Sequence, residues 1–175
     1  SENDSTRNMY VAVVPETGDA TALLVLLGGS GYAPNDVLAQ TEIPVLAAQQ
    51  GVMTVIPLLA TGPTSFGMDA ASQRSLKEII DLVVAKYHLK DKDLYVGGFS
   101  VGGTCAVRYA ELAVQEDYAI KPTAVFAINP PLDWERYYNA AKRVVRISQP
   151  DQVNPEVHYM LESIEQEMNG TPATA

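Results

Sequence analysis

Apolar residues along this chain follow two patterns, short unbroken runs and longer stretches where they recur every three or four positions. An unbroken run of four to eight is typical of a strand covered on both faces, and the second pattern of an amphipathic helix. The expected strands are residues 10–15, Ala22–Leu27, Val52–Leu58, 94–98 and Ala124–Ile128. Because strands and helices alternate, we predict an α/β fold with a mostly parallel sheet and helices on both faces.

Capping and helix-breaking residues set the expected helix bounds. Asn35 or Asp36 can cap a first helix to about Gln50, which Pro44 must kink or divide. The clearest helix spans residues 69–87, where apolar side chains hold one face. Further helices are expected from Ser100 to about Leu112, from an Asp133 cap through Val145, and from an Asn154 cap with Pro155 first to Gly170.

The chain is organised around residues 93–109, DLYVGGFSVGGTCAVRY, which reads as a strand, a sharp turn and a helix. Gly98, Ser100 and Gly102 form a G-x-S-x-G pattern at that turn, the context in which the pattern indicates a nucleophilic serine. A strained turn that exposes a hydroxyl leaves no room for a Cβ two residues to either side. The Val101 N–H, at the positive end of the helix, could then bind an oxyanion. An ordinary glycine-rich turn is the structural alternative.

The same residues also match most of the sequence pattern of a phosphate-binding loop. Residues 97–104, GGFSVGGT, fit G-x-x-x-x-G-K-[ST] except that Gly103 stands where the lysine belongs. That lysine supplies the positive charge that meets the phosphates. We therefore prefer a catalytic serine to a nucleotide site.

Composition narrows the classes of partner. With 175 residues, 47% of them hydrophobic, residues 1–175 are expected to form a single domain. The net charge of −9 disfavours nucleic acid and anionic membranes. The single cysteine, Cys105, excludes an internal disulfide and a cysteine-rich metal site, and we expect no metal or cofactor. No apolar run has the length of a membrane span. The first residue is Ser1 rather than Met, and we favour a secreted or periplasmic location over a cytoplasmic one.

The order and spacing of the segments LLVLLGGSGY, VMTVIPL, LYVGGFSVGG and AVFAINPPLD resemble the α/β-hydrolase superfamily from about Tyr10 to Asp133, and most of all its serine esterases and acyl hydrolases. The resemblance implies that Ser100 attacks a carboxylic ester or a related acyl bond of a small molecule. It also implies a second oxyanion donor in the loop after residues 22–27, where the backbone N–H of Gly29 or Ser30 could serve. Gly28 stands where the family often has a histidine.

The family pattern is incomplete at its C-terminal end. In the family, the acid and the histidine of the triad follow later strands, which this chain does not show. His88 is expected at the end of its strand opposite Ser100, His158 is either a surface residue or part of a cap, and Asp133 is either a helix cap or the acid. Residues 131–175 are a candidate cap or lid.

Two explanations remain. Either the chain is the first part of a longer hydrolase, or the fold has lost its triad and is a non-catalytic binding or scaffold protein. A sheet that stopped at residues 124–128 would expose an edge, so we expect a second chain or fragment to cover it.

Overall fold

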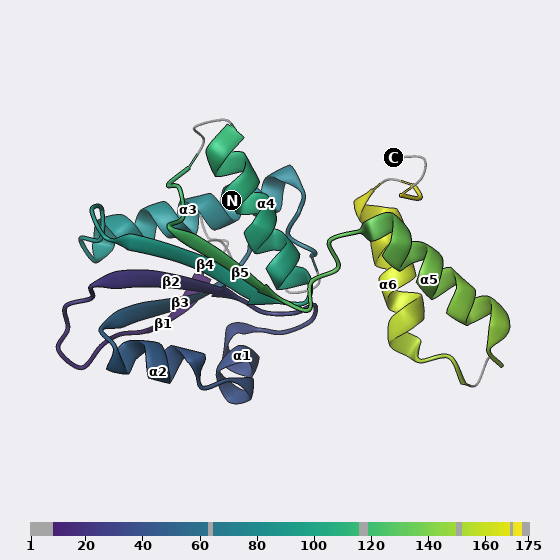
Figure 1. The fold of residues 1–175 in the computed structure, drawn as a ribbon, viewed down its shortest axis with the longest axis horizontal. Helices are drawn as coiled ribbons and strands as arrows, with labels where there is room; N and C mark the ends of the chain where they lie inside the picture. Colours follow the sequence, from purple (N-terminus) through teal and green to yellow (C-terminus); the bar gives the residue numbers. More distant parts are fainter. Residues whose placement is uncertain (1–8, 63–64, 116–118, 150–151, 169, 173–175) are drawn as a thin grey trace, which may run out of the picture. The chain divides into compact units, whose positions relative to one another are not determined.

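A computed structural model describes residues 9–62, 65–115, 119–149, 152–168 and 170–172 of the chain (Figure 1). The chain divides after Pro130 into two compact units. The first unit contains the sheet and the helices that cover it, and the second contains the last helices.

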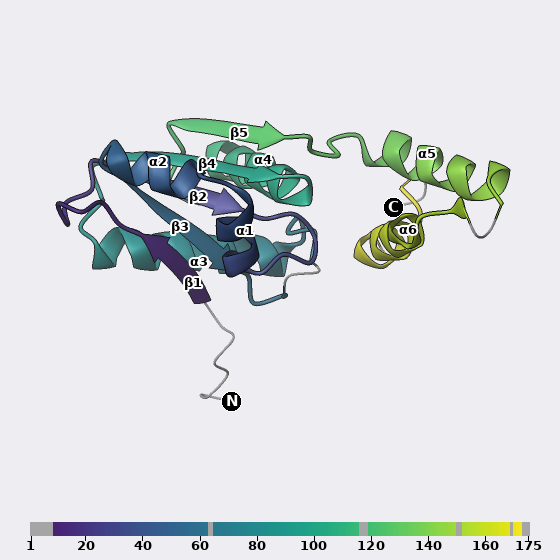
Figure 2. The same cartoon turned by 90° about the horizontal axis from the view of Figure 1, so that it is seen from below.

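The described residues of the first unit form a five-stranded sheet in the order β1-β3-β2-β4-β5. The strands are β1 (Met9–Val13), β2 (Ala22–Leu27), β3 (Val52–Leu58), β4 (Asp93–Phe99) and β5 (Ala124–Ile128). Strand β1 pairs with β3 antiparallel, whereas all the other neighbours are parallel. The predicted mostly parallel sheet is thus confirmed. In this sheet β1 and β5 are the edge strands (Figure 2).

Helices cover both faces of the sheet, as predicted. Helices α3 (Ala70–Lys86) and α4 (Val101–Gln115) lie on one face, and α1 (Pro34–Gln40) and α2 (Ile43–Gln49) lie on the other (Figure 1). Strand β2 is buried on both faces: Leu23 and Val25 pack in the core beneath α3 and α4, and Leu24 and Leu26 pack in the core that contains Val37 of α1.

The first helical stretch differs from its prediction. It is divided into α1 and α2, and the break falls at residues 41–42, so Pro44 lies in the first turn of α2 instead of interrupting a helix. The capping prediction was wrong, since Ala33 is the N-cap residue and Pro34 the first helical residue. Asp36 instead accepts a hydrogen bond from the Ala33 N–H at 2.8 Å, from inside the first turn.

The bounds of the later helices are closer to expectation. Helix α3 has close to the predicted bounds of 69–87, and Asp69 is its N-cap residue, with its carboxylate accepting hydrogen bonds from the N–H groups of Ala71 and Ser72. Helix α4 continues to Gln115, past the predicted end near Leu112.

The second unit contains α5 (Trp134–Ile147) and α6 (Pro155–Glu167), which pack against each other. Asp133 caps α5 by accepting a hydrogen bond from the Arg136 N–H at 2.9 Å, which accounts for this carboxylate as a helix cap. The Tyr138 hydroxyl donates to Glu165 of α6, and this hydrogen bond raises the pKa of Tyr138. The cap role of residues 131–175 stays a prediction.

Candidate active site

Ser100 is the single residue between the end of β4 at Phe99 and the start of α4 at Val101. Its φ of 50° lies in the left-handed region, which a residue with a side chain adopts at a cost of about 1–3 kcal/mol. Its backbone N–H donates to the Ile128 carbonyl at the end of β5, at 2.9 Å. The side chain is exposed. The chain therefore turns sharply from strand to helix and presents a hydroxyl to solvent.

Gly98 and Gly102 allow this turn because backbone atoms of neighbouring segments lie directly against both of them. A Cβ at Gly98 would lie 2.5 Å from the carbonyl carbon of Gly102, and a Cβ at Gly102 would lie 2.2 Å from the Gly28 oxygen. Non-bonded carbon atoms normally stay about 3.5 Å or more apart. Any side chain at either position would push α4 away from the strands below it.

Two N–H groups at the start of α4 are available to a ligand. The Ser100 carbonyl accepts hydrogen bonds from the N–H groups of Gly103 at 2.9 Å and Thr104 at 3.3 Å. The N–H groups of Val101 and Gly102 have no acceptor among the described residues. They lie at the positive end of the helix dipole, where an anion is stabilised.

The loop after β2 approaches the same point. Residues 29–32 form a β-turn in which the Tyr32 N–H donates to the Gly29 carbonyl at 3.2 Å, and Gly31 takes the positive φ of 80° that a type II turn needs. An ideal Cβ on Gly29 would lie 3.7 Å from the Ser100 Cβ. Gly29 is thus placed beside Ser100.

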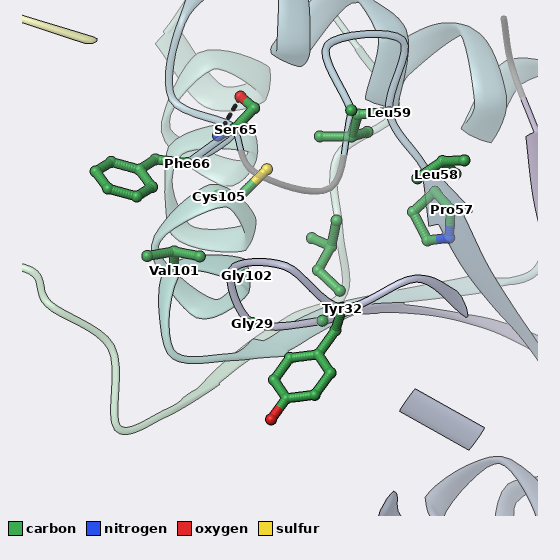
Figure 3. Close-up of a pocket in the computed structure, with 14 residues that line it drawn as sticks. Gly29, Tyr32, Pro57, Leu58, Leu59, Ser65, Phe66, Val101, Gly102 and Cys105 are labelled. Atoms are coloured by element: carbon green, nitrogen blue, oxygen red, sulfur yellow. Dashed lines mark hydrogen bonds between the residues drawn. The ribbon is translucent and has the colours of Figure 1, made fainter. Parts of the chain in front are cut away.

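A small cavity of about 40 Å³ lies where this loop, α4 and the loop after β3 meet (Figure 3). Its lining includes Gly29, Tyr32, Phe66, Val101 and Cys105. Such a volume has room for about one water molecule or one oxygen-sized group. Cys105 is buried in its wall, as expected from its position on the helix.

A hydroxyl network that the sequence did not reveal holds the loop after β3. Ser72 of α3 hydrogen-bonds Thr61 at 2.7 Å and Ser65 at 2.9 Å, and it donates to the Asp69 carboxylate. Burial alone raises the pKa of Asp69, but hydrogen bonds from the Ser72 hydroxyl and from nearby backbone N–H groups outweigh it and lower the pKa below its ordinary value. In the sequence, Asp69 stands at the expected start of a helix, and nothing there shows that the hydroxyls converge on it.

Within the first unit, no histidine side chain among the described residues lies near Ser100. His88 lies before β4 and Ser100 lies after it, so the seven residues of β4, at about 3.3 Å each, put about 23 Å between them. His88 has a φ of 56° and is an exposed residue that follows Tyr87, the C-cap residue of α3. His158 is exposed on α6 of the second unit. The Ser100 hydroxyl has no hydrogen-bond partner among the described residues.

The phosphate-loop alternative is contradicted by the backbone. Residues 97–99 belong to β4 and pair with β5, and Gly97 and Gly98 also pair with β2. A phosphate loop needs these residues to leave the sheet and to turn their N–H groups toward the ligand. In this chain the turn is confined to Ser100.

No protein-family model matches the sequence. A bifunctional acetylxylan esterase/xylanase of Neocallimastix patriciarum, XynS20E, is 27% identical over 103 residues, which are 58% of this chain and 15% of that protein. The structure resembles a putative hydrolase of Legionella pneumophila with a TM-score of 0.60 at 18% identity, over 87% of this chain and 44% of that one. It also resembles the Bacillus licheniformis lipase BlEst2 with a TM-score of 0.59 at 11% identity, over 94% and 67%.

The chain has the α/β-hydrolase fold, and esterases and lipases are among the proteins that it resembles. It spans 15% of the length of the curated relative and 44% of the Legionella structure. The described residues contain no cluster of histidine, cysteine and carboxylate side chains suited to a metal ion. Nor does any helix in the described part of the chain combine the length and apolarity needed to cross a membrane.

Proposed function

We propose that this chain carries the nucleophile and the oxyanion-binding groups of a serine hydrolase that acts on a carboxylic ester. The observation that carries the proposal is Ser100 itself, exposed at a one-residue turn with a φ of 50° directly before two N–H groups that have no acceptor among the described residues. The similarity to an esterase and a lipase supports an ester, in preference to another acyl compound, as the substrate.

In the proposed reaction, Ser100 Oγ bonds to the ester carbonyl carbon as its proton passes to a base. The carbonyl oxygen becomes an oxyanion, which the N–H groups of Val101 and of Gly29 or Ser30 stabilise. Of the last two, Gly29 lines the 40 Å³ cavity together with Val101, which favours Gly29. The alcohol then leaves with a proton, and water hydrolyses the acyl-serine to a carboxylic acid and free Ser100.

The base and the acid are proposed to come from residues outside this sequence or from a second chain. His88 is excluded by its place at the other end of β4. Strand β5 is an edge of the described sheet, and Val125 and Ile128 are exposed on it at 36% and 45%. A further strand added at this edge would bury them and could carry the missing side chains, with residues 131–175 acting as a cap.

Fluorophosphonate labelling of the intact gene product tests this proposal. We expect the probe to attach to Ser100 and the label to disappear in Ser100→Ala. Ser163→Ala, on α6, is the matched control and should be labelled like the natural protein. Labelling that persists in Ser100→Ala would move the nucleophile to another residue.

The second candidate is a non-catalytic binding or scaffold protein on the same fold. It is favoured by the lack of any hydrogen-bond partner for the Ser100 hydroxyl among the described residues. If the intact, folded gene product resists the probe, the enzyme proposal is wrong and this alternative gains.

A further inference from the structure

A second hollow, of about 130 Å³, is lined by Ser100 itself and shares Gly28, Gly29 and Tyr32 with the cavity described above. Its walls come from the loop after β2 (Gly29 and Tyr32), from α1 (Val37 and Gln40) and from the end of β4 (Phe99 and Ser100). Apart from the Gln40 amide and two hydroxyls at its rim, these walls are apolar. Val37 is 4% exposed and packs against the backbone of Gly28, so the inner wall is firmly built.

We propose that this hollow, which we call the acyl pocket, receives the acyl chain of the ester and limits the substrates to esters of short acids of about two to five carbons. The inference rests on the proposed function. It concerns the part of the substrate that stays bonded to Ser100 after the alcohol leaves.

The relation between the two hollows sets the orientation of the substrate. Gly29 and Tyr32 line both of them, whereas Val101 lines the smaller cavity and Ser100 lines the acyl pocket. A carbonyl carbon bonded to Ser100 Oγ carries three other groups. Its oxygen points to the N–H of Val101, its apolar chain enters the acyl pocket, and its alcohol leaves on the solvent side, where Ser100 is exposed.

The volume of the acyl pocket sets the limit on chain length. An apolar protein cavity of about 150 Å³ holds one benzene molecule, so a hollow of this size holds about five carbon atoms. Each methylene buried there should raise kcat/KM by about fourfold. Beyond about five carbons the chain must displace Val37 from the inner wall, so kcat/KM should fall.

The test is hydrolysis of p-nitrophenyl esters from acetate to octanoate by the intact gene product. We expect kcat/KM to rise from acetate to about pentanoate and to fall by at least tenfold at octanoate. Val37→Ala should extend the optimum by one or two carbons. Val45→Ala, at an exposed position of α2, is the matched control and should leave the profile unchanged.

A second variant guards against loss of folding in Val37→Ala. Gln40 is exposed at the rim, so Gln40→Trp should fold normally and shift the optimum to acetate. A profile that is identical in the natural protein, Val37→Ala and Gln40→Trp would overturn the acyl pocket while leaving the serine hydrolase intact. The acyl pocket would also be overturned if Val37→Ala and Gln40→Trp left the preference for acyl length unchanged and altered the preference among acetate esters of different alcohols. If no ester is hydrolysed and Ser100 is not labelled, the proposed function itself fails.

Discussion

Replacing Gly102 with alanine should damage both the stability and the reactivity of the turn at Ser100. The new Cβ would lie 2.2 Å from the Gly28 oxygen and 2.7 Å from the Leu27 oxygen, which are both backbone atoms. No side chain can rotate to relieve these contacts, so α4 must move away from β2 by about 1 Å. Alanine gains up to about 1 kcal/mol in helix propensity, but overpacking typically costs 1–3 kcal/mol and its most severe cases cost more. We expect a net loss of about 2 kcal/mol.

The displacement should also reduce the reaction of Ser100. Moving the Val101 N–H by about 1 Å from the proposed oxyanion position should slow labelling by about 100-fold. Denaturant unfolding and the rate of fluorophosphonate labelling measure the two effects. Gly103→Ala is the matched control, because it lies in the same helical turn but its nearest contacts are at 3.0 Å. If Gly102→Ala is as stable and as reactive as Gly103→Ala, the steric account of this turn is wrong.

Three further substitutions test other parts of the first unit. His88→Gly should raise the free energy of unfolding by about 1 kcal/mol, since His88 holds a φ of 56° that glycine adopts freely. The same variant should leave the labelling of Ser100 unchanged, and loss of labelling would restore His88 as a candidate for the base. Thr54→Val should stabilise the protein by about 1 kcal/mol in thermal unfolding, because the buried Thr54 hydroxyl has no partner among the described residues. Thr21→Val is the control: it removes a hydrogen bond to the Gly51 carbonyl and should not stabilise the protein. Asp69→Asn should lower Tm at neutral pH. Because the lowered pKa of Asp69 adds stability above the ordinary value of 3.8 that is lost as the pH falls below it, the difference from the natural protein should shrink between pH 5 and pH 3; a constant difference would count against the hydroxyl network.

The sequence was sufficient for those features that local chemistry determines. The unbroken apolar runs at Ala22–Leu27 and Val52–Leu58 are strands because a strand covered on both faces needs no polar positions. The turn at Ser100 was predictable because glycines at set distances from a serine leave few other conformations. The resemblance that these segments carry extended the prediction to the fold.

Features that depend on tertiary contacts were not predictable. Helix α1 begins at Pro34 with an N-cap, Ala33, whose side chain gives no signal, and Asp36 stabilises the start from inside the helix. Tyr32, Val37 and Gln40 line the same hollow as Ser100 because β2 pairs with β4, with Leu27 opposite Gly98. No periodicity in the sequence shows that the segment after one strand lies over the end of another.

The candidate site separates into a backbone part and a side-chain part with different structural requirements. The proposed oxyanion donors are N–H groups that follow adjacent strands, so the pairing of β2 with β4 is enough to place them. A base and an acid must instead be delivered as side chains, and general-base catalysis typically contributes about 10²–10⁴-fold to such a reaction. Strand β5 links the two parts, because its Ile128 carbonyl holds the Ser100 N–H on one side while its other side is an edge of the described sheet. A strand that joined β5 would therefore lie next to the strand that holds the proposed nucleophile, and it could bring the proton acceptor along the same edge.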